Sequence, residues 1–147
     1  QRSSLQDSLY EVLDKADLTG LLHTVKRLFA AMPWRNFIHS QLPDYEGYYA
    51  SVLYAFFASL DATIIPEDIS NRGQADLTVI LGSHVYVMEF KVIDGETLDD
   101  NPALAQLQQR RYADKYRGKA DKTVHEIGWI FSRTLRGLVR ADWDTTP

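Results

Sequence analysis

The segment QADLTVILGSHVYVMEFK, residues 74–91, decides the fold prediction because it reads as a β-hairpin. Two apolar stretches flank Gly82 and Ser83, and glycine in the first central position favours a type II′ turn. In the register set by this turn, Asp76 lies directly opposite Glu89, in a pair without backbone hydrogen bonds between its members. Lys91, two residues further along, shares their face of the sheet. The hairpin is therefore predicted to bring three charged side chains together.

Two carboxylates on neighbouring strands repel each other unless a cation lies between them or one of them is protonated. Mg²⁺ suits such a pair because it binds few carboxylates and keeps several waters. A neighbouring lysine can orient or deprotonate an attacking water, or stabilise a phosphate oxyanion. The pattern thus indicates metal-assisted phosphodiester hydrolysis. Two alternatives stay open: a purely structural hairpin with a Glu89–Lys91 salt bridge, and a bulge that sends the carboxylates to opposite faces.

The bulk composition limits the classes of function. A chain of 147 residues can bury one sizeable core. It contains no cysteine, which excludes disulfides, thiolate zinc sites and a cysteine nucleophile. The net charge of −4 gives no global attraction to nucleic acid, so any such surface must come from local clusters of Lys and Arg. There is no long apolar run or signal segment, so we expect no membrane partner and a cytoplasmic location. Because the first residue is Gln1, we expect a fragment of a longer protein.

The remaining pattern predicts helices around one sheet. Apolar spacing predicts two helices within residues 3–31, with a break near Asp17, and a third from Asp44 to Leu60. A short strand is expected to end at Pro66, before a polar turn and the hairpin. Asn101 and Pro102 are typical of a helix start, and that helix is expected to reach Gly118. Strands are predicted at residues 123–132 and, shorter, at 137–143.

Asp76 followed by Glu89-Phe90-Lys91 resembles the core motif of the PD-(D/E)XK nuclease superfamily. The stretches DYEGYYASVLYAFFASL, ALAQLQQRRYADKY and IGWIFS extend the resemblance over roughly residues 17–143. They are similar to the nuclease-like domain that follows an AAA-ATPase-like domain in a group of bacterial proteins. The resemblance implies an α/β, restriction-endonuclease-like core: a mixed central β-sheet flanked by helices in the order αβββαβ. Residues 1–40 would form a helical extension packed on a nuclease-like domain at 41–147.

The resemblance also implies roles for particular residues. Asp76 and Glu89 would bind Mg²⁺ or Mn²⁺, the Phe90 backbone carbonyl would be a third ligand, and Lys91 would be the catalytic lysine. Two further residues match supporting positions of the family's site, namely Glu46 in the first core helix and Gln106 in the helix after the hairpin. Glu46 is explained equally well as an acidic residue at a helix N-terminus. The chain departs from the family at Gln74, where arginine is usual, and the hairpin register places Gln74 opposite Lys91.

A basic stretch supplies the candidate nucleic-acid contacts. Arg110 and Tyr112 match the family's basic and tyrosine positions, and Arg111 and Lys115 lie in the densest cluster of cations in the chain. They could contact a phosphate backbone, although a solvated helix face is the alternative. The leading interpretation is a metal-dependent nuclease acting on nucleic acid, with DNA expected. The alternative is a catalytically inactive module of the same fold that docks to an ATPase-like domain or to nucleic acid. The oligomeric state, a dimer included, is left open.

Overall fold

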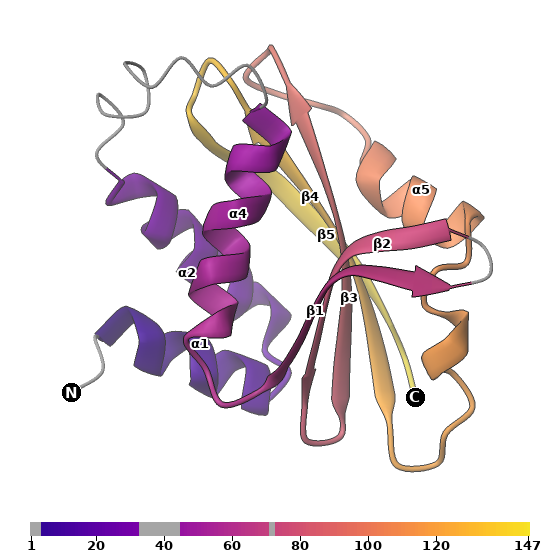
Figure 1. Cartoon of the computed structure of the whole chain (residues 1–147). Coiled ribbons are helices and arrows are strands. Elements are labelled where there is room, and N and C mark those ends of the chain that lie inside the picture. The colour runs from indigo at the N-terminus through magenta and orange to yellow at the C-terminus, as the bar shows by residue number, and fades with distance from the viewer. Residues whose placement is uncertain (1–3, 33–44, 71–72) are drawn as a thin grey trace.

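The computed structural model describes residues 4–32, 45–70 and 73–147, with three helices before the strands and one between them (Figure 1). The helices are α1 (Ser4–Asp14), α2 (Leu18–Ala30), α4 (Tyr45–Ala58) and α5 (Pro102–Gln109), and a 3₁₀ turn follows at Asp114–Tyr116. The strands are β1 (Thr63–Ser70), β2 (Gly73–Leu81), β3 (His84–Ile93), β4 (Thr123–Ser132) and β5 (Gly137–Thr146).

All five strands form one sheet in the order β1-β2-β3-β4-β5. Neighbouring strands are antiparallel except β3 and β4, which are parallel and are connected through α5. A parallel pair needs such a crossover, and here α5 supplies it. The predicted α/β fold with a mixed sheet and flanking helices is therefore confirmed.

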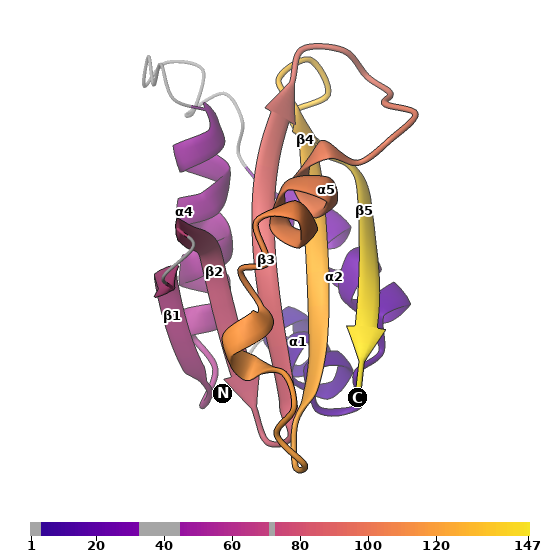
Figure 2. The same ribbon diagram turned by 90° about the vertical axis from the view of Figure 1, so that its right-hand side faces the viewer.

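The N-terminal helices cover one face of the sheet, while α5 lies on the other (Figures 1 and 2). Under α2 and α4 the core is aromatic: Tyr49 stacks on Phe131 with ring centroids 4.5 Å apart, and Phe29 packs edge-on against both rings. Aromatic pairs of this kind contribute beyond the area that they bury. Within the part of the chain that the structure describes, no helix combines the length and apolar character needed to cross a membrane.

Helix α5 is held against the sheet by its cap and by a glycine. The Asn101 side chain accepts from the Leu104 N–H at 2.9 Å and donates to the Gly128 carbonyl at 2.9 Å. A Cβ on Gly128 would lie 2.3 Å from the Leu104 nitrogen, so no other residue fits there without displacing the helix. Gly128 pairs with Glu89 in the β3–β4 register. The close approach of α5 therefore occurs directly beside Glu89.

The prediction that the helix reaches Gly118 is wrong, because α5 ends at Gln109. Arg111 adopts a φ of 56°, and the Tyr112 N–H reaches back to the Leu107 carbonyl at 3.3 Å. This is the Schellman arrangement, with arginine in the position that usually holds glycine. Leu107 and Tyr112 belong to the same buried cluster, which stabilises the helix end. The spacing of the residues after Arg110 favours a longer helix, but the burial of Tyr112 favours an end at Gln109, and the burial decides.

The strands also differ at their ends from the prediction. β1 does not stop at Pro66 but continues to Ser70, because an edge strand can accommodate a proline that donates no hydrogen bond. β5 is longer than expected and reaches Thr146. The predicted helix break is confirmed, since Asp17 caps α2 by accepting from the Gly20 N–H at 3.0 Å. The predicted cap at Asp44 lies outside the described residues.

Candidate functional site

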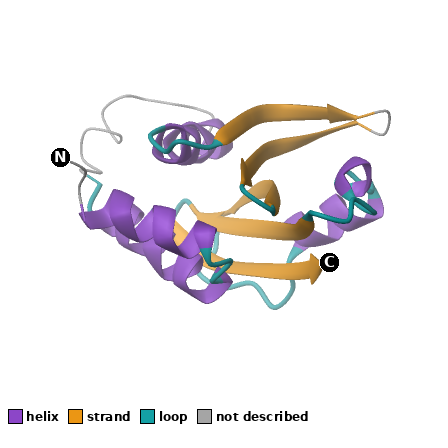
Figure 3. Cartoon of the chain, turned by 90° about the horizontal axis from the view of Figure 1, so that it is seen from below, coloured by secondary structure: helices purple, strands orange, loops and turns teal. Residues whose placement is uncertain are grey.

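The hairpin has the predicted register, but its two strands separate earlier than expected. Pairing runs from Leu81↔His84 to Leu77↔Met88, around a turn in which Gly82 has a φ of 59°. Beyond Leu77, β2 stays paired only with β1, so the predicted backbone pairs of Asp76 with Glu89 and of Gln74 with Lys91 are not formed. Figure 3 shows the paired strands β1 and β2 extending away from the other strands.

The separation begins at a sharp twist in β2. Leu77 belongs to the core under α4, whereas Ala75 belongs to the core under α5, although alternate residues of a flat strand share one face. The β1 residue opposite Asp76 in this register is Glu67, which has a left-handed φ of 51°. Such a conformation is costly for a residue other than glycine. Both strands therefore bend at the same position, and we call the resulting gap between β2 and β3 the split.

Asp76 and Glu89 meet at the split through side-chain contacts with each other's backbone. The Asp76 N–H donates to Glu89 Oε1 at 3.2 Å, and the Phe90 N–H donates to Asp76 Oδ2 at 2.8 Å. These two bonds take the place of the ladder bonds that end at Leu77. The prediction of one shared sheet face needs correction, because Asp76 borders the α4 side while Glu89 contacts α5. The expected proximity of the two carboxylates is nevertheless present.

The Glu89 side chain is buried, with an exposed fraction of only 3%. Its environment therefore disfavours a negative charge. Burial, then the charge of Asp76 and a hydrogen bond between the two side chains, raise the pKa of Glu89 to about 8. The backbone hydrogen bond and the charge of Lys91 act in the opposite direction but are weaker. A carboxyl pair that does not readily hold two negative charges is a site that a cation would stabilise.

Gln106 and Lys91 complete the surroundings of Glu89. The Gln106 side-chain amide on α5 donates to Glu89 Oε2 at 2.5 Å, which fixes the rotamer of the carboxylate. Lys91 lies two residues after Glu89 on β3, is partly exposed, and acts electrostatically on Glu89. Glu46 is in the first turn of α4, but its side chain lies outside the described part of the chain.

The residues present fit a divalent cation of the Mg²⁺ type. Among the described residues, no group of three or more acidic or histidine side chains surrounds one point. Mg²⁺ does not require such a group, since one or two carboxylates and several waters are sufficient. Asp76 and Glu89 could supply the carboxylates, because each oxygen that accepts an N–H here retains a second lone pair. Phe90 follows Glu89 in the chain, and its backbone N–H donates to Asp76 Oδ2, so its carbonyl belongs to a residue that contacts both carboxylates.

The basic stretch after α5 is partly engaged within the protein. Lys115 pairs with the buried carboxylate of Asp68 at 2.5 Å, and Arg111 pairs with Asp114 at 2.6 Å. Tyr112 is only 5% exposed, so packing rather than surface contact accounts for its position. Arg110 is exposed at the C-terminal end of α5. Arg110 and Arg111 are exposed, so a phosphate backbone could reach their side chains.

Sequence reasoning missed two acidic residues of β1. Glu67 lies opposite Asp76, and Asp68 accepts from both Lys115 and Tyr116, the latter at 2.6 Å. Asp68 thereby ties β1 to the segment after α5. A second hairpin count, outward from the Ser70↔Gly73 pair, could have found Glu67, since it places that residue across from Asp76.

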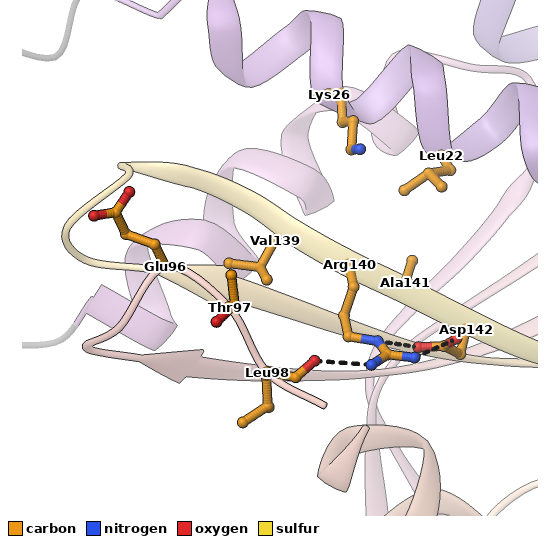
Figure 4. Close-up of a pocket in the computed structure, with 9 residues that line it drawn as sticks. All are labelled: Leu22, Lys26, Glu96, Thr97, Leu98, Val139, Arg140, Ala141 and Asp142. Carbon is orange, nitrogen blue, oxygen red and sulfur yellow. Dashed lines mark hydrogen bonds and ion pairs between the residues drawn. The ribbon is translucent and has the colours of Figure 1, made fainter. Parts of the chain in front are cut away.

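Three cavities of similar size lie on the surface of the described residues, and one of them, of about 360 Å³, lies between α2 and the turn into β5. The remaining two differ in the residues that line them. One, of about 370 Å³, lies between α2, β5 and the loop after β3 (Figure 4), where Arg140 is already bound to Asp142 and to the Leu98 carbonyl. It contains none of the predicted site residues. The other, of about 340 Å³, lies beside α4 and includes Asp76 and Phe90. The second cavity adjoins the carboxylates, so it is the one relevant to their chemistry.

Comparisons with known proteins identify a family and a relative. The family model of the PD-(D/E)XK nuclease superfamily matches residues 44–140, which include both carboxylates, Lys91 and Gln106. A protein of Azotobacter chroococcum, named only as an uncharacterized protein in the vnfD 5′ region, is 40% identical over 131 residues. That match covers 89% of this chain and 25% of the relative, so the chain spans about a quarter of the relative's length. No solved structure matches the chain.

Proposed function

Since the chain belongs to the PD-(D/E)XK nuclease superfamily, we propose that it is a divalent-metal-dependent nuclease that hydrolyses phosphodiester bonds of nucleic acid. The main support for this proposal is that the carboxyl groups of Asp76 and Glu89 meet at the split, with Lys91 on β3 two residues after Glu89. The proposal needs these three residues in their assigned roles, because the fold alone supports many functions.

Asp76 and Glu89 would hold Mg²⁺ or Mn²⁺, with the Phe90 carbonyl as a further ligand. When bound, such an ion polarises a phosphoryl oxygen and lowers the pKa of a water. Gln106 holds Glu89 in position through its hydrogen bond, as groups behind a metal ligand commonly do. Glu46 is proposed as an additional acidic group that supports the site or its water.

Lys91 is proposed as the catalytic lysine. Its ammonium is a donor that can orient the attacking water, and its charge can stabilise the negative charge that develops on the phosphate. Arg110 and Arg111, exposed where α5 ends, would bind flanking phosphates of the substrate. Contacts of Lys115 and Tyr112 with nucleic acid would require rearrangement, because the first holds Asp68 and the second is buried.

The 40% identical relative is about four times as long as its matching region, and this supports a proposal about context. We place the nuclease domain at residues 41–147, with residues 1–40 packed on it, within a longer cytoplasmic protein. An AAA-ATPase-like domain of that protein and DNA are the partners proposed. A non-cutting module that docks to that domain is the competing function, and a dimer is compatible with either.

The test is cleavage of single- and double-stranded DNA and RNA with Mg²⁺ or Mn²⁺. We expect the wild-type chain to cut at least one of these substrates, and Asp76→Ala and Lys91→Ala to lose that activity. Asp94→Ala, which alters an exposed carboxylate after β3, is the matched control and should cut normally. Cutting of no substrate, or equal cutting by all variants, would favour the non-cutting module.

A further inference from the structure

The cavity beside α4 borders the carboxylate site at Asp76. Its volume of about 340 Å³ lies at the small end of the range for ligand pockets in proteins. α4, the bent part of the β1–β2 hairpin and β3 form its walls. Ser51, Tyr54, Glu67, Asp76 and Phe90 are among the residues that line it. Because it includes Asp76, a substrate whose phosphate lies at the carboxylates would place a neighbouring group in this cavity.

The walls suit an aromatic ligand. Tyr54 is 41% exposed, and Leu135 is the other large apolar side chain exposed among the described residues. Ser51 and Tyr54 are three residues apart on α4, so they lie on one face of the helix. An exposed tyrosine offers a stacking surface for a nucleobase, and loss of such a surface typically weakens binding measurably.

The charged residues of the cavity disfavour a phosphate in its interior. Its charged residues are Glu67 and Asp76, and among the described lining residues no side chain is cationic. Glu67 lies opposite Asp76 in the β1–β2 register and lines the cavity. A carboxylate accepts hydrogen bonds, and the exocyclic amino groups of cytosine and adenine are suitable donors. Thymine and uracil have no such amino group.

We propose that this cavity binds one nucleobase of the substrate strand, with Tyr54 stacking on the base and Glu67 accepting from its amino group. The inference deepens the proposed nuclease function and rests on it, because the strand is placed by its phosphate at Asp76 and Glu89. A base in this position is unstacked and unpaired, so the preferred substrate is single-stranded at that nucleotide. Amino-bearing bases are bound there more tightly than thymine.

The test measures binding of labelled single-stranded DNA by fluorescence anisotropy, with Ca²⁺ in place of Mg²⁺. Tyr54→Ala should raise the Kd by roughly 5- to 100-fold, the range for loss of one base stack, and Tyr54→Phe should leave it near the wild-type value. An oligonucleotide with an abasic position at the bound nucleotide should bind Tyr54→Ala and wild type equally. Leu135→Ala is the matched control and should have no effect.

Glu67 is tested by base preference. The wild-type chain should bind an oligocytidine about 5-fold or more tightly than an oligothymidine, and Glu67→Gln should lose this preference while its Mn²⁺ affinity stays unchanged. A fall in Mn²⁺ affinity in Glu67→Gln would overturn the assignment to base recognition. Equal Kd values for wild type and Tyr54→Ala would overturn the stacking role.

The two proposals fail in different ways. If wild type cuts DNA and Tyr54→Ala cuts at the same rate with the same affinity, the base pocket is wrong and the nuclease function stands. If wild type binds with the predicted base preference but cuts nothing, the pocket is supported and the nuclease function is wrong. If wild type neither binds nor cuts nucleic acid, both are wrong.

Discussion

The burial of Glu89 beside Asp76 predicts that the metal-free protein loses stability as the pH rises. A carboxyl pKa raised from 4.5 to about 8 means that the folded protein binds a proton that the unfolded chain releases. The stabilisation that the protonated Glu89 carboxyl provides is fully present below pH 4.5 and is lost as the pH rises through 8. At about 1.36 kcal/mol for each pH unit, the loss between pH 5 and pH 8 is on the order of 3 kcal/mol.

Chemical denaturation in EDTA measures this effect. The free energy of unfolding of wild type should fall between pH 5 and pH 8, relative to Glu89→Gln, which cannot ionise at this position. Added Mg²⁺ should restore stability at pH 8 more than at pH 5, since the cation binds the ionised pair and a proton must leave first. Glu96→Gln, a change at an exposed carboxylate, should follow wild type. Parallel curves for wild type and Glu89→Gln would refute the reasoning.

Three further substitutions test the contacts that hold α5, Glu89 and β1 in position around the site. Gly128→Ala should lower the free energy of unfolding by about 1–3 kcal/mol, because the added Cβ would lie 2.3 Å from the backbone of α5. Thermal unfolding measures this loss, and an unchanged Tm would contradict the tight packing. Gln106→Leu should weaken Mn²⁺ binding by about 10- to 100-fold in a calorimetric titration, because Glu89 loses its donor. Gln108→Leu is the matched control on the same helix, and equal affinities in the two variants would remove the positioning role. Lys115→Met should lower the free energy of unfolding by roughly 1–3 kcal/mol, because the buried carboxylate of Asp68 loses its cation. Urea denaturation measures this loss, and an unchanged free energy of unfolding would contradict that pairing.

Much of the hairpin could be predicted because its information is local. Gly82 and Ser83 set the turn, and the turn sets the register as far as Leu77 and Met88. The same register indicated that Asp76 and Glu89 would be close. Local sequence therefore identified the two carboxylates, even though they meet through side-chain hydrogen bonds and not as a backbone pair.

The split could not be predicted because distant contacts produce it. Asp68 on β1 and Gly73 on β2 both lie against the segment after α5, where Asp68 binds Lys115 and a Cβ on Gly73 would touch Tyr112. The same burial of Tyr112 ends α5 at Gln109. None of these contacts is visible in the spacing of residues along one element, so the bend at Asp76 was missed.

The most direct test of the central claim is the binding of Mn²⁺, measured by electron paramagnetic resonance on wild type, Asp76→Asn and Glu89→Gln at pH 8. The account predicts one bound ion in wild type and loss of that ion in both variants, because the two carboxylates hold it together. Asp94→Asn, at an exposed position, should bind like wild type. Retention of the ion in either site variant would contradict a shared site at the split.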